Sequence, residues 1–163
     1  MSRPILELET VLDGMIAEHR KLLTQMDAQH AAMKAMDVKK IDDLLRLQDA
    51  TRGRIIGLDA RRVLLVKQAA VQYQMTGEVT LKRLADHVPK ENGKLLRLRD
   101  ELRTLVLQVQ QRTTVVGKIA HAVCGHLNTA LRILANAVER SGVYTRGGVP
   151  RVATRIGTMD ARG

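Results

Sequence analysis

The sequence predicts an all-α protein: an elongated antiparallel three-helix coiled-coil bundle with a short connecting helix and a flexible C-terminal tail. The chain of 163 residues is 45% apolar yet has no Phe, no Trp and only two Tyr, so its core must be aliphatic. Its three prolines, Pro4, Pro89 and Pro150, leave two long stretches free for uninterrupted helix. Within these stretches apolar residues recur at alternating steps of three and four, which is the spacing of a coiled-coil seam.

The first two helices are expected over residues 4–35 and 38–74. Between them, Asp37 is suited to the N-cap of the second helix, because its carboxylate can accept backbone N–H groups of the first turn. A tight helical hairpin follows. The first seam comprises Ile5, Leu8, Leu12, Met15, His19, Leu22, Met26, His30 and Met33. The second comprises Ile41, Leu44, Gln48, Thr51, Ile55, Leu58, Arg62 and Leu65, widened by Leu45, Ile56, Val63 and Val66.

A short helix and a very long one are expected after the hairpin. Thr80 can cap a connecting helix over residues 81–88, which Pro89 ends. The third long helix covers residues 90–140, because its seam continues from Leu95 to Ala137. Periodicity stops there, so residues 141–163 are expected to form a flexible basic tail after a single helical domain over residues 1–140.

Charge and cysteine content narrow the class of protein. The formal net charge of +10 suggests nucleic acid, an anionic membrane or an acidic protein as partner, but the basic residues are spread over two helices and the tail. No stretch is apolar for long enough to enter a membrane, so we expect no membrane insertion. The single cysteine and the absence of an apolar leader at the N-terminus favour a cytoplasmic location.

No arrangement of side chains predicts catalysis, a metal site or a cofactor. His121, Cys124 and His126 share the long helix, but the two histidines point about 140° apart at 100° per residue. No Gly-rich phosphate-binding loop follows a strand. The aspartates of the second helix, such as the Asp42 and Asp43 pair, have basic neighbours at helical spacing and are explained as surface ion pairs. We therefore expect a protein that is not an enzyme.

Several residues inside the predicted helices depart from the apolar pattern. His19 and His30 lie in the seam, where they either fix the helix register or act as a pH-sensitive switch. Four glycines also fall within helices, where each is expected to cost about 1 kcal/mol relative to Ala. Close backbone approach, local bending and simple tolerance are the alternatives for Gly53, Gly57, Gly117 and Gly125.

The strongest prediction of binding concerns the C-terminal half of the long helix. This helix should be longer than its partners and should leave an apolar surface uncovered, which is suited to binding an amphipathic helix. The connecting helix, the tail or a second copy of the chain are the alternative ways to cover it, although we expect a monomer. The predicted partner-binding residues are Val116, Ile119, Ala120, Val123, Leu127, Ala130, Leu131, Leu134 and Val138.

Four short segments resemble the FlgN family of flagellar export chaperones. They are EHRKLL at residues 18–23, KAMD at 34–37, LDARR at 58–62 and VYTRGG at 143–148, the last being similar to a Tyr-Gly-x-x-Gly segment of that family. The resemblance implies a chaperone that holds the helical ends of hook-associated (hook-filament junction) proteins and delivers them to the flagellar type III export apparatus. It also implies that cargo binds to the last long helix.

Two other functions remain as alternatives. A basic helical nucleic-acid-binding protein could use the arginines of the second and third long helices, but the chain lacks base-stacking aromatics and any DNA-reading motif. We therefore do not expect nucleic acid to be the partner. A structural coiled-coil component of a secretion apparatus is the other alternative.

Overall fold

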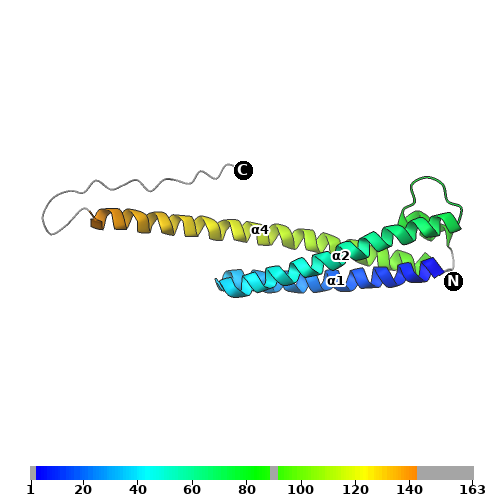
Figure 1. Cartoon of the computed structure of the whole chain (residues 1–163), viewed down its shortest axis with the longest axis horizontal. Helices are drawn as coiled ribbons and strands as arrows, with labels where there is room; N and C mark the ends of the chain where they lie inside the picture. The colour runs from blue at the N-terminus through cyan, green and yellow to red at the C-terminus, as the bar shows by residue number, and fades with distance from the viewer. Residues whose placement is uncertain (1–2, 89–91, 143–163) are drawn as a thin grey trace. The chain divides into compact units, whose positions relative to one another are not determined.

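The structure, a computed structural model, describes residues 3–88 and 92–142, and these residues form four α-helices and no strand (Figure 1). The helices are α1 (Arg3–Lys34), α2 (Val38–Gln72), α3 (Leu81–His87) and α4 (Asn92–Gly142). The all-α class is thus confirmed. Each helix limit differs from its expected position by one or two residues at most. The predicted tail lies outside the described residues, except that 141 and 142 continue α4.

The chain divides into two compact units, Met1–Ile119 and Ala120–Gly163. The first unit contains α1, α2, α3 and the first half of α4, and the second contains the remainder of that helix.

The α1–α2 turn is closed by two interlocked helix ends. Met36 adopts a left-handed conformation, with φ of 55°, and the backbone N–H groups of Met36 and Asp37 donate to the carbonyls of Met33 and Ala32. These two bonds form a Schellman motif that terminates α1. Asp37 then caps α2, since its Oδ1 accepts from the backbone N–H of Lys40 at 3.0 Å. One residue therefore ends the first helix and begins the second, which confirms the predicted cap and explains the tight hairpin.

The core of the first unit is aliphatic and joins all four helices. Its centre lies where the first half of α1 meets the end of α2, α3 and the first turns of α4; Thr80 caps α3, and its Oγ1 accepts from the backbone N–H of Arg83 at 3.2 Å. The side chains are packed without any Phe or Trp. The buried cluster comprises Ile5, Leu8, Val11, Leu12, Met15, Ile16, Leu65, Val66, Ala69, Leu84, Ala85, Val88, Leu95, Leu98 and Leu105.

Ion pairs between the helices define their directions within the first unit. Glu9 pairs with Lys94, Arg20 with Glu101, and Asp27 with Arg112 at 3.0 Å, so the residue numbers of α1 and α4 rise together. In contrast, Glu18 of α1 pairs at 2.9 Å with Arg54 of α2, while Glu7 reaches the later residue Arg61 at 3.6 Å. Hence α1 and α4 run in the same direction, and α2 runs opposite to α1.

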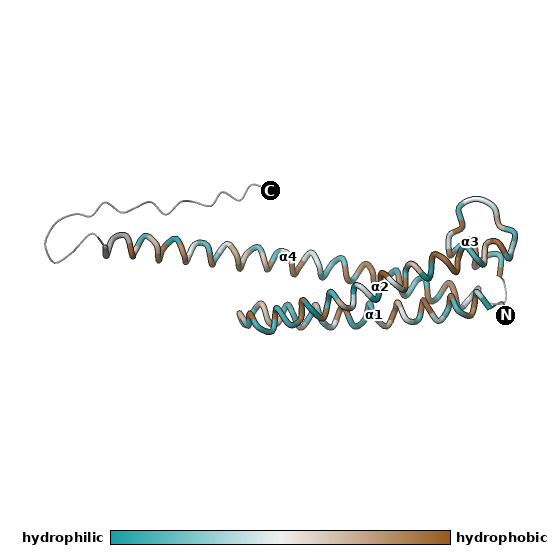
Figure 2. The backbone as a smooth tube through the Cα atoms, in the orientation of Figure 1, coloured by the Kyte–Doolittle hydropathy of each residue, from teal (hydrophilic) through white to brown (hydrophobic). Residues whose placement is uncertain are grey.

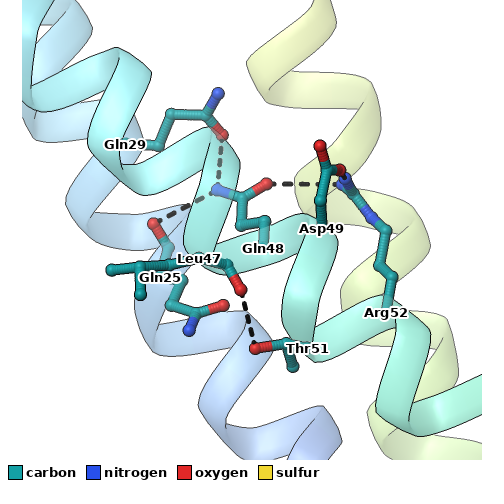
Figure 3. A network of polar contacts seen from close by, with 7 residues as sticks. All are labelled: Gln25, Gln29, Leu47, Gln48, Asp49, Thr51 and Arg52. Carbon is teal, nitrogen blue, oxygen red and sulfur yellow. Dashed lines mark hydrogen bonds and ion pairs between the residues drawn. The ribbon is translucent and has the colours of Figure 1, made fainter.

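A buried polar contact sets the register between α1 and α2 (Figure 3). The side-chain amide of Gln48 donates to Oε1 of Gln29 at 2.8 Å, and its own Oε1 accepts from Arg52 at 3.3 Å. Both glutamines are buried. Because an unpaired amide in this position would be costly, the pair favours one alignment of the two helices.

The seam histidine His19 is buried and bonds to the backbone of its own helix. Its Nδ1 lies 2.7 Å from the carbonyl oxygen of Met15 in the same helix. A carbonyl can only accept, so Nδ1 carries the proton in this contact. The structure gives His19 no hydrogen bond to another helix, and the described polar bond that joins α1 to α2 in the seam is made by Gln48 instead.

The second apolar row predicted on α2 is mostly exposed. Val66 is buried, but Leu45, Ile56 and Val63 are exposed to solvent, which leaves a broken apolar surface on this helix. The internal glycines also have open surroundings, since a Cβ atom built on Gly53, Gly57, Gly117 or Gly125 would meet nothing within 4 Å. Close backbone approach is therefore the wrong explanation for these four positions.

The open surroundings of Gly53 predict that Gly53→Ala stabilises the protein. We expect the free energy of unfolding to rise by about 0.5–1 kcal/mol, because alanine reduces the freedom of the unfolded chain and fits the helix without a clash. Urea denaturation followed by circular dichroism measures the change. Gly77→Ala is the matched control, since Gly77 has a φ of +80° and the same substitution there should lower stability. A loss of stability in both variants would contradict the prediction.

The glutamine pair predicts opposite effects of single and double substitution. Gln48→Leu should lower the free energy of unfolding by about 1–3 kcal/mol, because it leaves the Gln29 amide buried without its partner. Adding Gln29→Leu should restore most of that loss, since two leucines replace two paired polar groups. Denaturation midpoints of the three variants test this coupling. Additive effects of the two substitutions would show that the hydrogen bond has no part in it.

Candidate functional site

The C-terminal part of α4 is a helix without a buried face. Within the described side chains of α4, the last buried residue is Leu105, and none from residue 106 to 138 is buried. Apolar residues nevertheless continue to recur along the helix to its last turns, as the hydropathy colouring shows (Figure 2). Such a pattern is typical of a helix whose apolar face packs against another surface.

The nine residues predicted to bind a partner lie on one side of α4. At 3.6 residues per turn their side chains fall within an arc of about 120°, which is the width of a face that packs against another helix. Val116, Ile119, Ala120 and Val123 are half-buried, whereas Leu127, Ala130, Leu131, Leu134 and Val138 are exposed. We call the last five residues the apolar stripe; they all belong to the second unit.

The surroundings of the apolar stripe contain almost no charge. From residue 120 to 138 the sequence has one arginine, Arg132, and no Lys, Asp or Glu. Ile133 is also exposed but lies about 120° from Leu127, so the apolar surface extends beyond the stripe. Solvated helices usually keep charged residues on their exposed side, so this composition is unusual for a helix surface that faces solvent.

Polar side chains of the same segment include a threonine, a cysteine and two histidines. The hydroxyl of Thr129 donates to the carbonyl oxygen of Gly125 at 3.0 Å within the helix, and Cys124 is exposed as a free thiol. The parts of the chain that the structure describes contain no group of three or more His, Cys, Asp or Glu placed to hold a metal ion. His121, Cys124 and His126 thus do not form such a group.

No helix in the described ranges has the length and apolar character needed to cross a bilayer.

An all-helical chain with an uncharged, exposed apolar stripe belongs to the class of helical protein-binding proteins. Comparison with protein families gives this class a specific identity. The sequence model described as FlgN protein matches residues 1–151, so the chain belongs to the FlgN family. Searches among curated proteins and among solved structures gave no significant match.

Membership of the FlgN family places the chain among flagellar export chaperones, with a role in flagellum assembly and type III protein export. The family is one of chaperones rather than of enzymes, and its partners are flagellar proteins. The helical structure and the three-four spacing fit the coiled-coil character expected from the sequence.

The exposure of Cys124 predicts rapid labelling of the native protein. Cys124 is the only cysteine of the chain and lies three residues before Leu127. We expect a maleimide to react with it in native buffer at a rate within about tenfold of the rate in urea, since an exposed thiol needs no unfolding to react. Stopped-flow or mass-spectrometric labelling measures both rates. Strong protection in the free protein would mean that another segment or a second copy covers this part of α4.

Proposed function

We propose that this protein is a flagellar export chaperone that binds the helical terminal segments of hook-filament junction proteins, prevents their premature self-association and aids their delivery to the export apparatus. Support for a chaperone role comes from the family match over residues 1–151. We propose hook-filament junction proteins as the cargo, and the export apparatus as its destination, because the resemblance to the FlgN family implies both.

The observation that carries this proposal is the apolar stripe on α4. Leu127, Leu131, Leu134 and Val138 follow one another at steps of four, three and four residues, as in the seam of a coiled coil. A cargo helix laid along the stripe would bury these side chains, and each fully buried Leu or Val contributes about 1.5–3 kcal/mol. Four half-buried residues are also among the predicted partner-binding residues, Val116 and Ile119 in the first unit and Ala120 and Val123 in the second.

Helical pairing suits the task of a chaperone for filament proteins. Segments that form coiled coils in a filament expose apolar seams before assembly, and such seams associate with each other. A helix that covers the seam prevents this association, and it leaves without breaking any covalent bond. The interaction needs no nucleotide, metal or other cofactor, because its free energy comes from apolar burial.

The proposed architecture for this task is an elongated antiparallel three-helix coiled-coil bundle. Support comes from the opposite directions of α1 and α2, the shared direction of α1 and α4, and their common aliphatic core. We further propose a helical domain over residues 1–140 and a tail over 141–163. We propose that the protein acts in the cytoplasm and as a monomer. Sedimentation equilibrium of the purified chain tests whether it is a monomer.

Leu134→Asp tests whether the stripe binds cargo. A purified hook-associated protein from the same organism is titrated into each variant by calorimetry. We expect Leu134→Asp to weaken binding by at least about 30-fold, because it removes a buried leucine and places a carboxylate in an apolar interface. The helix should persist, since Leu134 is 61% exposed in the free protein.

The matched control is Leu64→Asp, because Leu64 is also a helical leucine, 55% exposed, on α2. It should bind cargo as the unsubstituted protein does. Circular dichroism verifies that both variants are folded. Equal binding by Leu134→Asp and Leu64→Asp would exclude the stripe as the cargo site, and binding of duplex DNA in place of the hook-associated protein would exclude the chaperone proposal.

A further inference from the structure

The first unit contains a groove that the cargo proposal does not use. It has a volume of about 810 Å³ and lies among α1, α2, the start of α3 and the first half of α4. Buried side chains of α1, including Leu12 and Met15, form its floor. The lining residues are Leu12, Met15, His19, Ile55, Ile56, Asp59, Arg62, Thr80, Leu81, Lys82, Arg99, Leu102, Arg103, Val106, Leu107 and Gln110.

The two walls of the groove expose large aliphatic side chains. Ile56 of α2 is 69% exposed and Leu107 of α4 is 51% exposed, and both line the groove. Such side chains on facing walls, above an apolar floor, gain most from a ligand that is itself apolar on one side.

The length of the groove fits a helix. The α4 wall runs from Arg99 to Gln110, and its lining residues recur at steps of three, one, three, one and three. This face spans about 16 Å at 1.5 Å per residue, or about three helical turns. An amphipathic helix of that length could place its apolar residues, spaced at i, i+3, i+4 and i+7, between the two walls.

The rim of the groove is basic. Four cationic side chains, Arg62, Lys82, Arg99 and Arg103, line it against one carboxylate, Asp59. Arg62 pairs with Asp59 at 2.8 Å, and Arg99 lies 3.4 Å from Asp100. Within residues 3–88 and 92–142, Lys82 and Arg103 make no ion pair or side-chain hydrogen bond, so both remain able to bind an anion.

The charge of the rim disfavours the two occupants that the chain itself could supply. Residues 143–163 carry four arginines and one aspartate, so this segment would be repelled by the rim. A second copy of the chain brings a net charge of +10 to the same surface. An acidic ligand is favoured by the same charges, and the apolar walls favour a peptide helix over a nucleic acid backbone.

We propose that the groove binds an acidic amphipathic helix of another protein, at a site separate from the apolar stripe of α4. The apolar face of that helix packs against Ile56, Leu102 and Leu107, and its carboxylates pair with Lys82 and Arg103. The protein then has two binding surfaces, an uncharged one on the second unit and a basic one on the first.

A pair of synthetic peptides tests this proposal on the full-length protein. Both are helical, about 18 residues long, and carry leucines at i, i+3, i+4 and i+7; one has glutamates beside the apolar face and its twin has lysines at the same positions. Fluorescence anisotropy should show the acidic peptide binding at least about tenfold more tightly than its twin.

Reversing the charge of two groove residues should make the protein prefer the basic peptide over the acidic one. Lys82→Glu combined with Arg103→Glu should weaken the acidic peptide by at least about tenfold and strengthen the basic one. The control combines Arg97→Glu with Lys118→Glu, which changes the net charge equally at exposed sites outside the groove. It should change both affinities by less than about threefold.

The apolar part of the proposal is tested by Leu107→Ser against Leu64→Ser. The two leucines have similar exposure, but only Leu107 lines the groove, so only its substitution should weaken the acidic peptide. Leu134→Asp should leave peptide binding intact, which separates this site from the stripe and allows either proposal to fail alone.

Three results would overturn the proposal. Equal binding of the two peptides would remove the acidic preference. Loss of binding on charge reversal without any effect of Leu107→Ser would mean that the groove only attracts polyanions. A dimer in sedimentation equilibrium that is lost in Leu107→Ser would identify a second copy of the chain as the occupant.

Discussion

The aliphatic core of the first unit ends on α4 at Leu105, although the helix continues to Gly142. The end of the buried core at Leu105 determines which apolar residues of α4 stabilise the fold and which stay exposed. The hairpin of α1 and α2 supplies apolar partners for the first turns of α4, and beyond them the same three-four pattern has no buried positions. An apolar surface that folding does not bury remains as a source of binding free energy. The buried part of the seam thus stabilises the fold, and the segment that follows it is the part for which we propose a cargo-binding role.

Polar contacts favour one alignment of the helices in this core, which the aliphatic side chains alone do not. Leu, Ile, Val and Met pack in many ways, so an aliphatic seam alone allows helices to slide by a turn. The Gln48 and Gln29 pair aligns α2 with α1. The buried carboxylate of Glu9 is paired with Lys94, which fixes the start of α4 against α1. A shifted helix would leave these groups buried and unpaired, at a cost greater than that of losing a surface ion pair.

Sequence reasoning predicted what depends on periodicity and local chemistry, namely the helical class, the Asp37 and Thr80 caps and the face of α4 that carries the apolar stripe. Met36 after α1 and Gln74 after α2 take the left-handed conformation, where glycine is the usual marker, so no glycine indicated these two positions. Sequence reasoning placed Ile56 on a packing row, whereas that side chain lines an open groove. The groove brings together residues from distant segments, such as Leu12 and Leu107, and periodicity along one helix holds no information about that proximity. His19 is buried at the seam position predicted for it, whereas its bond to the Met15 carbonyl could not be derived from the spacing.

The absence of Phe and Trp has an optical consequence. Tryptophan dominates the near-ultraviolet absorption and fluorescence of most proteins, and this chain has only Tyr73 and Tyr144 to contribute there. The protein is therefore almost dark in the spectral window where a tryptophan-containing partner is bright. In a mixture excited where tryptophan absorbs and tyrosine does not, the emission comes from a tryptophan-containing partner, so a change in that partner's environment is observed without a label on either molecule.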